Sequence, residues 1–460
     1  MKKNDIFRGV CLGYTEDGLG VVRNDSFVFF VKGILKGEEA DIRILSLKKN
    51  YGYGKVEKIL TPSASRREAA CPYYPKCGGC QIMHMDYAEQ LRFKEEKVKE
   101  SFGKIAHMDQ EVLPILGAKA EYRYRNKVQI PLQYEEGKLK GGFYRSYSHD
   151  VVEIDDCLLQ SEEGNQVYRD AFQLIQSYHY ERDIRHILIK HAFRNGEIML
   201  VLISRKEKLK GIEAFADEIM KKDPLVTTVV VNLNQREDNV ILGEKNIVIR
   251  GSGYITDTLL GKQFKISPNS FYQINPAQTE VLYRTAIDFA SLSGEEIIAD
   301  IYGGIGTIGI CASDHAKEVY GVEWVQEAVE DAKENSRINH LSNTHYEVGD
   351  AGKAVEKWLK EGIKIDVAFI DPPRKGCDDL TIQSLVKLEP EKIVYVSCNP
   401  ATLARDCAKF AELGYVTERI QPVDMFPNTN HIETVCCLYH QKKDSVSVPY
   451  EPKDVGYLKD

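Results

Sequence analysis

The stretch VYVSCNPATLARD, from Val394 to Asp406, could supply a nucleophile. Its apolar run predicts a buried strand that ends at Cys398, and Asn399 and Pro400 are typical of the first residues of a helix. A helix N-terminus has partial positive charge and free N–H groups, so we expect it to lower the pKa of the Cys398 thiol. The alternative is a small buried side chain at a strand end, the commonest role of a free cysteine.

A glycine-rich turn and a series of acids indicate a second set of functional groups. From about residue 261, strands and helices alternate, which is typical of a parallel α/β sheet. In IIADIYGGIGTIGICA, the glycines at 303, 304 and 306 follow a strand and let the backbone approach a ligand. The next strands end at Glu323, Asp350 and Asp371. Glu323 follows the turn by about 20 residues, where Rossmann-type domains place the acid that binds ribose hydroxyls, and Asp350 suits an adenine end.

These acids favour a nucleoside ligand that has no phosphate chain. No strand–turn–helix element in the sequence offers the lysine of a phosphate-binding loop. S-adenosylmethionine therefore fits better than NAD, although the glycine-rich turns for the two ligands overlap. We expect the C-terminal region to be a Rossmann-like domain that binds S-adenosylmethionine.

Three closely spaced cysteines indicate a metal or cluster site. Cys71, Cys77 and Cys80 are spaced C-x5-C-x2-C in a loop rich in Pro and Gly. Cys157 is the nearest candidate for a fourth ligand, because the cysteines after it all fall in the later domain. Four thiolates suit either a structural zinc ion or an iron–sulfur cluster, and nothing local separates the two. The spacing differs from the C-x3-C-x2-C of radical enzymes, and three unliganded cysteines are the remaining alternative.

Residues 1–60 predict a small β-barrel. Short alternating runs broken by Gly and Asp-Gly indicate about five strands, as in barrels of the OB type. Basic and aromatic residues share one ribbon, which suits nucleic-acid backbones and bases. These residues are Lys48, Lys49, Tyr51, Tyr53 and Lys55. The segment also resembles the TRAM domain, an RNA-binding barrel of RNA-modifying enzymes; the alternative is a barrel whose lysines only increase solubility.

The elements between the barrel and the C-terminal region are of two kinds. Residues 86–102 place Tyr87, Leu91, Lys94 and Val98 at helical spacing, which predicts an amphipathic helix. Residues 118–260 alternate in several runs and predict a mixed α+β domain. This domain adds basic and aromatic side chains beside Cys157, namely Arg123, Arg125, Lys127, Arg145 and Tyr147.

Charge and composition favour a nucleic-acid partner and exclude a membrane span. Of 460 residues, 43% are hydrophobic and 28% charged, and the net charge is −8. Residues 1–150 hold 26 Lys and Arg against 20 Asp and Glu, whereas residues 151–460 hold 35 against 49. A basic N-terminal third suits contact with phosphate, although an uneven solvated surface would give the same count. Without an apolar leader, and with 11 cysteines, we expect a cytoplasmic monomer.

The motifs FYQIN, DIYGGIG, GVE, DPPR, SCNP and HIE follow one another in this order. With the barrel and the four cysteines, they resemble the RNA uracil-5-methyltransferases, specifically the 23S ribosomal RNA branch with a TRAM domain and a [4Fe-4S] cluster. One departure is Gly303, where DLYCG is more usual. The resemblance covers nearly the whole chain.

The resemblance implies a role for each matching residue. It implies S-adenosylmethionine contacts from Gln273, Tyr302, Thr307, Glu323, Asp350 and Asp371. It implies Cys398 as nucleophile, Glu433 as base, and a [4Fe-4S] cluster bound by Cys71, Cys77, Cys80 and Cys157. It also implies a discontinuous arrangement: a barrel at 1–60, a cluster-bearing RNA-binding domain at 61–85 and 118–260, and a methyltransferase domain at 86–117 and 261–460.

The implied reaction makes 5-methyluridine. A thiolate that adds to uracil C6 makes C5 nucleophilic enough to accept a methyl group, and a base then removes the C5 proton. The apolar run TVCCL after Glu433 is expected to raise the pKa of that carboxyl, and His431 is expected to orient neighbouring groups. Arg374 after Pro-Pro favours a carbon target over an exocyclic amine. The uridine must be unpaired or flipped out of its stack.

Two other functions compete with methylation of 23S rRNA. One is a tRNA uracil-5-methyltransferase, a group that tends to lack both the barrel and the cluster cysteines. The other is a redox-sensing RNA-binding protein with an inert methyltransferase domain. Retention of Cys398, Glu433 and every strand-end acid argues against an inert domain.

Overall fold

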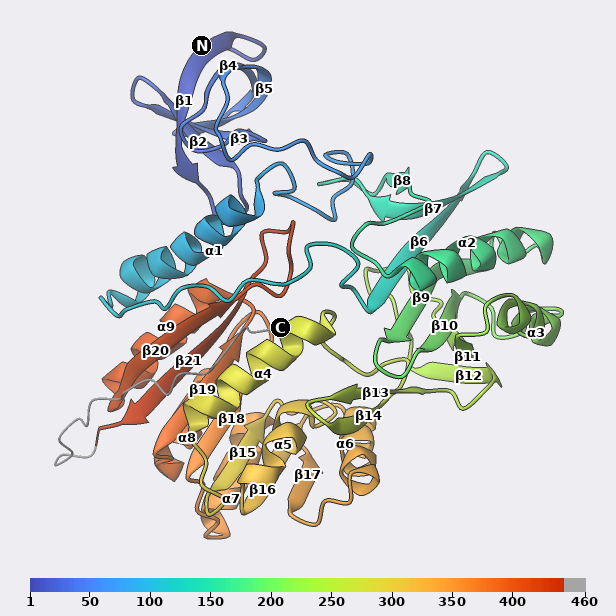
Figure 1. Ribbon diagram of the computed structural model, residues 1–460, viewed down its shortest axis with the longest axis vertical. Helices are drawn as coiled ribbons and strands as arrows, with labels where there is room; N and C mark the ends of the chain where they lie inside the picture. Colours follow the sequence, from blue (N-terminus) through green and yellow to red (C-terminus); the bar gives the residue numbers. More distant parts are fainter. Residues whose placement is uncertain (442–460) are drawn as a thin grey trace, which may run out of the picture.

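The computed structural model describes residues 1–441 and is built on a barrel and two large sheets (Figure 1). The C-terminal domain is expected to reach residue 460, and its last residues, 442–460, lie outside the described part. Among the described residues, none of the helices combines the length and the apolar run that crossing a membrane requires.

The N-terminal strands close into a small barrel, as predicted. They are β1 (Ile6–Tyr14), β2 (Gly20–Asn24), β3 (Phe27–Lys32), β4 (Glu39–Leu47) and β5 (Tyr51–Thr61). Their order around the barrel is β1-β2-β3-β5-β4. Alternation of apolar residues along the strands fills the interior with side chains such as Val22, Phe29 and Ile42.

The central region is a sheet covered on one face by two helices. Its strands are β6 (Lys127–Glu135), β7 (Lys138–Tyr144), β8 (Val151–Glu153), β9 (Ile184–Ala192), β10 (Glu197–Ser204), β11 (Val226–Leu233) and β12 (Lys245–Arg250). Their order is β12-β11-β10-β9-β6-β7-β8. Helices α2 (Glu162–Ser177) and α3 (Ile212–Lys222) pack on it, and the hairpin β13 (Ile255–Leu259) and β14 (Lys262–Ile266) leads onward.

The C-terminal region is a mostly parallel sheet with helices on both faces. Its strands are β15 (Ile297–Ile301), β16 (Glu318–Glu323), β17 (Thr344–Val348), β18 (Val367–Ile370), β19 (Lys392–Ser397), β20 (Tyr415–Val423) and β21 (Glu433–His440), in the order β17-β16-β15-β18-β19-β21-β20. Its helices are α4 (Pro276–Ala290), α5 (Thr307–Ala312), α6 (Gln326–Ile338), α7 (Ala351–Lys360), α8 (Asp379–Leu388) and α9 (Pro400–Glu412). Strand β21 alone runs antiparallel to both its neighbours, β19 and β20.

Helix α1 (Tyr87–Ser101) lies between the barrel and the C-terminal sheet (Figure 1). The helix predicted over 86–102 is confirmed, and Asp86 caps it, since its carboxylate accepts a hydrogen bond from the N–H of Glu89. The helix contacts α9 and β20 and continues as a π-helical turn, η1 (Phe102–Ala106). Its residues Val98 and Phe102 are buried in the apolar cluster that α7, α8 and α9 form on one face of the sheet.

One face of α1 holds the segment between β20 and β21, residues 424–432, which we call the 424–432 loop. The hydrogen-bonded pairs are Tyr87–Asp424, Gln90–Asn428, Lys94–Asp424 and Lys97–Asn430. The Nζ of Lys94 lies 2.5 Å from Oδ1 of Asp424, and neither side chain is exposed to solvent. Lys94 Nζ also donates to the carbonyl of Phe426. Because the desolvation of both charges is offset only while both are present, this pair requires the loop and the helix to stay together.

We expect Lys94→Met to lower the free energy of unfolding by about 3–5 kcal/mol, because it leaves the Asp424 carboxylate buried without its cation. Thermal and urea unfolding measure the change, and the double change Lys94→Met with Asp424→Asn should recover part of it. Lys99→Met is the matched control on the same helix, since Lys99 pairs with Glu95 at the surface and its loss should change stability by less than about 1 kcal/mol. Equal effects of Lys94→Met and Lys99→Met would show that the buried pair does not stabilise the fold.

Candidate active site

The carboxyl ends of the parallel strands bring three of the predicted residues into one row. The last residue of β15 is paired with the penultimate residue of β16 on one side and with the last residue of β18 on the other. Ile301, Val322 and Ile370 are therefore neighbours across the three strands. The residue that follows each of them, Tyr302, Glu323 or Asp371, continues this row. Asp350 follows β17, whose residue Val348 is paired with Glu323. This is the edge where parallel α/β sheets bind ligands.

The glycine-rich turn is shaped by the acids around it. Tyr302 and Gly304 have positive φ angles of 64° and 56°, and the N–H of Gly304 donates to Oε2 of Glu323 at 3.1 Å. The buried carboxylate of Asp300 accepts a hydrogen bond from the N–H of Gly309 at 3.0 Å. A Cβ at Gly309 would lie 2.7 Å from that carboxylate, so a side chain there would push α5 away from β15. Asp300 thus fixes the turn. It was not among the predicted site residues, although a charged residue within the apolar run IIADI could have indicated its role.

Thr307, Asp350 and Gln273 lie outside the row. Thr307 begins α5, and its Oγ1 lies 3.0 Å from Oη of Tyr283. Asp350 caps the N-terminus of α7 by accepting a hydrogen bond from the N–H of Lys353. Gln273 is buried just before α4, and its carbonyl accepts a hydrogen bond from Nδ2 of Asn126, next to the central sheet.

The pairing of β19 with β21 brings Cys398 to Glu433. The antiparallel ladder ends with Ser397 opposite Thr434, and one further step places Cys398 opposite Glu433. Asn399 caps α9 as predicted, with Pro400 at the first helical position. The sequence separates these two residues by a helix, a strand and a loop, so only the sheet register unites them.

The expectation of a lowered pKa for Cys398 is wrong for the protein on its own. Burial raises the pKa of this thiol to about 11, and the negative charges of Glu433 and Asp371 act in the same direction. Arg374 opposes them. The field of a helix N-terminus is worth about 0.3–1 kcal/mol, which is too little to outweigh burial beside two carboxyls.

Both neighbouring carboxyls also favour their protonated forms. Burial raises the pKa of Glu433 well above its usual value, as expected, and Asp371 adds to the effect. Burial and the charge of Asp300 raise the pKa of Asp371 to about 7. Within residues 1–441, no group donates a hydrogen bond to the Glu433 carboxyl. Arg374 is the positive charge that acts on both Cys398 and Glu433, and a cationic ligand would further stabilise the ionised groups of the site.

His431 lies in the 424–432 loop rather than on a strand. Its ring contacts that of Phe426 edge to face, and burial lowers its pKa to about 4. The imidazole is therefore neutral near pH 7.

All four predicted ligand cysteines line one cavity of about 270 Å³. They are Cys71, Cys77, Cys80 and Cys157. Burial raises the pKa of the thiols of Cys77, Cys80 and Cys157, and negative charge on the neighbouring cysteines would raise it further. Within the part of the chain that the structure describes, no three His, Cys, Asp or Glu residues are arranged to hold a metal ion.

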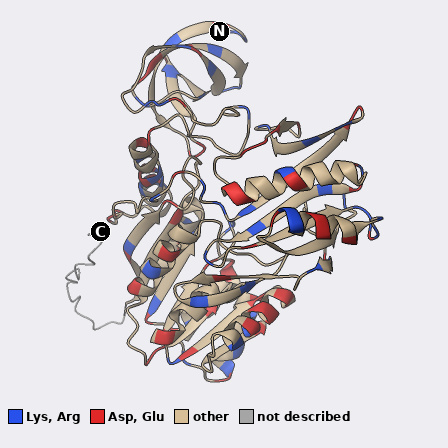
Figure 2. Cartoon of the chain, turned by 45° about the vertical axis from the view of Figure 1, so that its right-hand side comes forward, with Lys and Arg blue, Asp and Glu red and all other residues tan. Residues whose placement is uncertain are grey.

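Aromatic and basic side chains form a surface on the barrel. The ring of Phe30 lies 5.5 Å from that of Tyr51 and 5.9 Å from that of Tyr53, and both tyrosines are partly exposed. Lys32 on the same strand as Phe30 donates to Ser146 in the β7–β8 turn, which also holds the fully exposed Tyr147. Figure 2 shows Lys and Arg on the barrel strands, and many Asp and Glu on the helices of the C-terminal region. This surface can stack bases and attract phosphate.

Comparison with known proteins identifies relatives along the whole chain. A family model described as tRNA (Uracil-5-)-methyltransferase matches residues 86–442. An "Uncharacterized RNA methyltransferase" of Clostridium tetani is 42% identical over 453 residues, which are 96% of this chain and 98% of the relative. Another, of Halalkalibacterium halodurans, is 43% identical over 95% of this chain and 98% of its own length. The crystal structure of a Pyrococcus abyssi tRNA (uracil-54, C5)-methyltransferase with S-adenosyl-L-homocysteine is 26% identical, with a TM-score of 0.75 over 94% of this chain and 99% of its own.

Alkylation of Cys398 by iodoacetamide in the free protein should be slow at pH 7 and should rise about tenfold per pH unit up to at least pH 9, because only the thiolate reacts. Peptide mass spectrometry at each pH measures it. Glu433→Gln should shift this profile to lower pH, since it removes a negative charge beside the sulfur. Glu412→Gln, at the exposed far end of α9, serves as the control and should leave the profile unchanged. A rate that levels off below pH 8 in the unchanged protein would contradict the raised pKa.

Proposed function

The chain belongs to the RNA uracil-5-methyltransferase family, and we propose that it forms 5-methyluridine in 23S rRNA with S-adenosylmethionine as methyl donor. The observation that supports this most is the β19–β21 register, which places Cys398 beside Glu433 at the edge where the strand-end acids gather. A nucleophile and a buried acid side by side are what addition to a pyrimidine and later removal of its C5 proton require.

The residues at the strand ends fit S-adenosylmethionine. We propose that Gln273, Tyr302, Thr307, Glu323, Asp350 and Asp371 contact it. When bound, it supplies the methyl group that becomes bonded to uracil C5. Its sulfonium is a cation, which would add to the positive charge that Arg374 already places near Glu433 and would oppose the raised pKa of Asp371. The turn is open at Gly304, where an added Cβ would meet nothing within 4 Å, so a ligand could approach the backbone there.

The chain's own groups then divide the reaction into steps. The Cys398 thiol releases its proton to solvent, its sulfur forms a bond to C6, and the electron pair of the C5–C6 double bond moves to the C4 carbonyl. That pair then forms the bond from C5 to the methyl group, while the pair of the broken bond between the methyl group and the donor stays on the donor sulfur. After C5 has gained the methyl group, Glu433 takes the C5 proton, the double bond re-forms, and the bond from C6 to Cys398 breaks. A carboxyl with a raised pKa is a stronger base when ionised than an ordinary glutamate, which suits this proton transfer.

The RNA partner is proposed to contact the barrel and the central region. We propose a TRAM-type role for the barrel, with the Phe30, Tyr51 and Tyr53 rings as the stacking surface. A tRNA substrate is the second candidate, because the Pyrococcus abyssi structure at 26% identity is that of an enzyme acting on uracil-54 of tRNA. The barrel does not separate the two candidates, because the match to this tRNA enzyme covers 94% of the chain. We propose rRNA from the resemblance of the ordered motifs together with the four cysteines.

We propose that Cys71, Cys77, Cys80 and Cys157 bind a [4Fe-4S] cluster. Support comes from their common cavity of about 270 Å³ and from the sulfur-only donor set. Because no three of the described residues are arranged to hold a metal ion, the proposal requires the four side chains to converge when the cluster binds. Ligation of the thiolates would remove the electrostatic cost of holding four sulfurs together. The cluster would order the loop that precedes α1.

We expect protein purified without oxygen to be brown and to contain about four iron atoms per chain, as a [4Fe-4S] cluster requires. Iron analysis and the visible absorption spectrum measure it. Cys80→Ser should lose the iron, whereas Cys11→Ser, a buried cysteine of the barrel core, should keep it. One zinc per chain in place of iron would contradict the cluster.

We expect cells that lack the protein to lose 5-methyluridine from 23S rRNA and to keep it in tRNA. Mass mapping of both RNAs measures this. Complementation with the unchanged gene should restore the modification, and Cys398→Ala should not, although the purified variant should still bind S-adenosylmethionine because Cys398 is not among the proposed cofactor contacts. Loss from tRNA alone would favour the second candidate, and full activity of Cys398→Ala would contradict covalent catalysis.

A further inference from the structure

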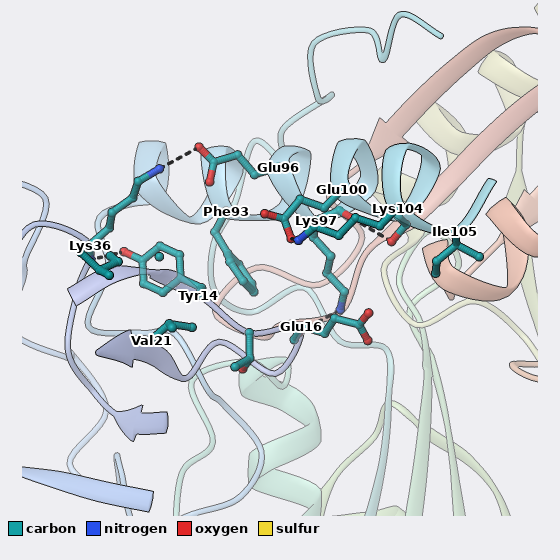
Figure 3. A pocket seen from close by; sticks show the side chains of 14 residues that line it. Tyr14, Glu16, Val21, Lys36, Phe93, Glu96, Lys97, Glu100, Lys104 and Ile105 are labelled. Carbon is teal, nitrogen blue, oxygen red and sulfur yellow. Dashed lines mark hydrogen bonds and ion pairs between the residues drawn. The ribbon is translucent and has the colours of Figure 1, made fainter. Parts of the chain in front are cut away.

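A cleft of about 490 Å³ separates the barrel from helix α1 (Figure 3). The β1–β2 side of the barrel forms one wall, and α1 with its π-helical extension forms the other. Charged side chains line it, among them Lys36, Glu96, Glu100 and Lys104. Most of them pair at the surface: Lys36 with Glu96, and Lys104 with Glu100.

Lys97 differs from these lysines in what it contacts. It points from α1 towards the barrel turn that contains Glu16 (Figure 3), and its Nζ donates to the carbonyl of Glu16 at 3.1 Å. The same Nζ donates to the carbonyl of Asn430 at 3.1 Å. Lys97 thus joins three segments: helix α1, the barrel turn and the 424–432 loop.

A second contact joins the barrel turn to the same point of the loop. The Nδ2 of Asn430 donates to Oδ1 of Asp17 at 3.5 Å. Asn430 directly precedes His431 and lies three residues before Glu433. The position of the barrel therefore bears on the loop immediately before the proposed base.

Lys97 is also unlike the other residues of α1 that hold the loop. Lys94 and Gln90 are fully buried and bind Asp424, Phe426 and Asn428 without contact to the barrel. Lys97 is half-buried, and both its hydrogen-bond partners are backbone carbonyls. A charged donor to two carbonyls fixes the path of two chains, and here the two chains are the barrel turn and the loop.

We propose that Lys97 is a positioning residue. Through its two hydrogen bonds, the position that the barrel takes when it binds RNA places Glu433 for removal of the C5 proton. The inference rests on the proposed function. Cys398 lies between β19 and α9, whereas both hydrogen bonds of Lys97 go to the barrel turn and the 424–432 loop, so addition to C6 and methyl transfer should proceed without it. The last step alone, in which the C5 proton passes to Glu433 and the bond between sulfur and C6 breaks, should slow down.

The test uses the full chain, S-adenosylmethionine and RNA extracted from cells that lack the protein. Lys97→Met should lower turnover about tenfold, an effect of the size of one lost charge-assisted hydrogen bond, while RNA affinity changes less than about twofold. A denaturant-resistant complex of protein and ordinary uridine RNA should accumulate, because the methylated base stays bonded to Cys398. Lys97→Arg should restore release. Lys104→Met, in the same cleft, should behave as the unchanged protein.

Accumulation of the complex with normal RNA binding supports the proposal, since a general loss of structure would lower complex formation and turnover together. Such a parallel loss, or unchanged turnover, would overturn it. If Lys97→Met does not fold, Asp17→Ala on the exposed turn removes the second contact and should cause a smaller accumulation; none would overturn the proposal. Absence of methyl transfer by the unchanged protein would overturn the proposed function as well.

Discussion

The buried ion pair between Lys94 and Asp424 is the constraint on which the arrangement of the site depends. Two charges withdrawn from water are tolerated only while they remain together, so the pair forces α1 and the 424–432 loop into a single position. The hydroxyl of Tyr87 donates a hydrogen bond to Oδ2, the other oxygen of the Asp424 carboxylate. The loop leads directly into β21, so the ion pair holds the chain that enters the strand, while the ladder between β19 and β21 places Glu433 opposite Cys398.

The electrostatics of the site follow from its depth. A thiol and three carboxyls lie at the buried ends of the strands, and burial raises the pKa of each: Cys398 to about 11, Asp371 to about 7, Asp300 to about 6 and Glu433 well above its usual value. The protein alone therefore holds its nucleophile as a thiol. A cationic ligand beside Asp371 would favour both the ionised acid and the thiolate. Binding of such a ligand should therefore increase the ionised fraction of Cys398.

Helices and strands could be predicted from neighbouring residues in the sequence, whereas the geometry of the site depends on contacts between distant segments. The cap at Asn399, the barrel strands and the strand-end acids could all be predicted, because each depends on neighbours within a few residues. Lys94 could be assigned to the helix but not to the buried pair, since its partner lies 330 residues away in the sequence. The pKa of Cys398 was predicted in the wrong direction for the same reason. The helix N-terminus is local, whereas the burial of the thiol, and after it the charges of Glu433 and Asp371, come from packing across the sheet.

The most direct measurement of the central claim is a covalent trap. RNA in which uridine is replaced by 5-fluorouridine cannot lose a proton from C5, so an enzyme that bonds to C6 and transfers a methyl group stays attached to it. With S-adenosylmethionine present, we expect a stable protein–RNA complex whose nucleotide, by peptide mass spectrometry, is bonded to Cys398. No complex, or one attached through another residue, would contradict the account.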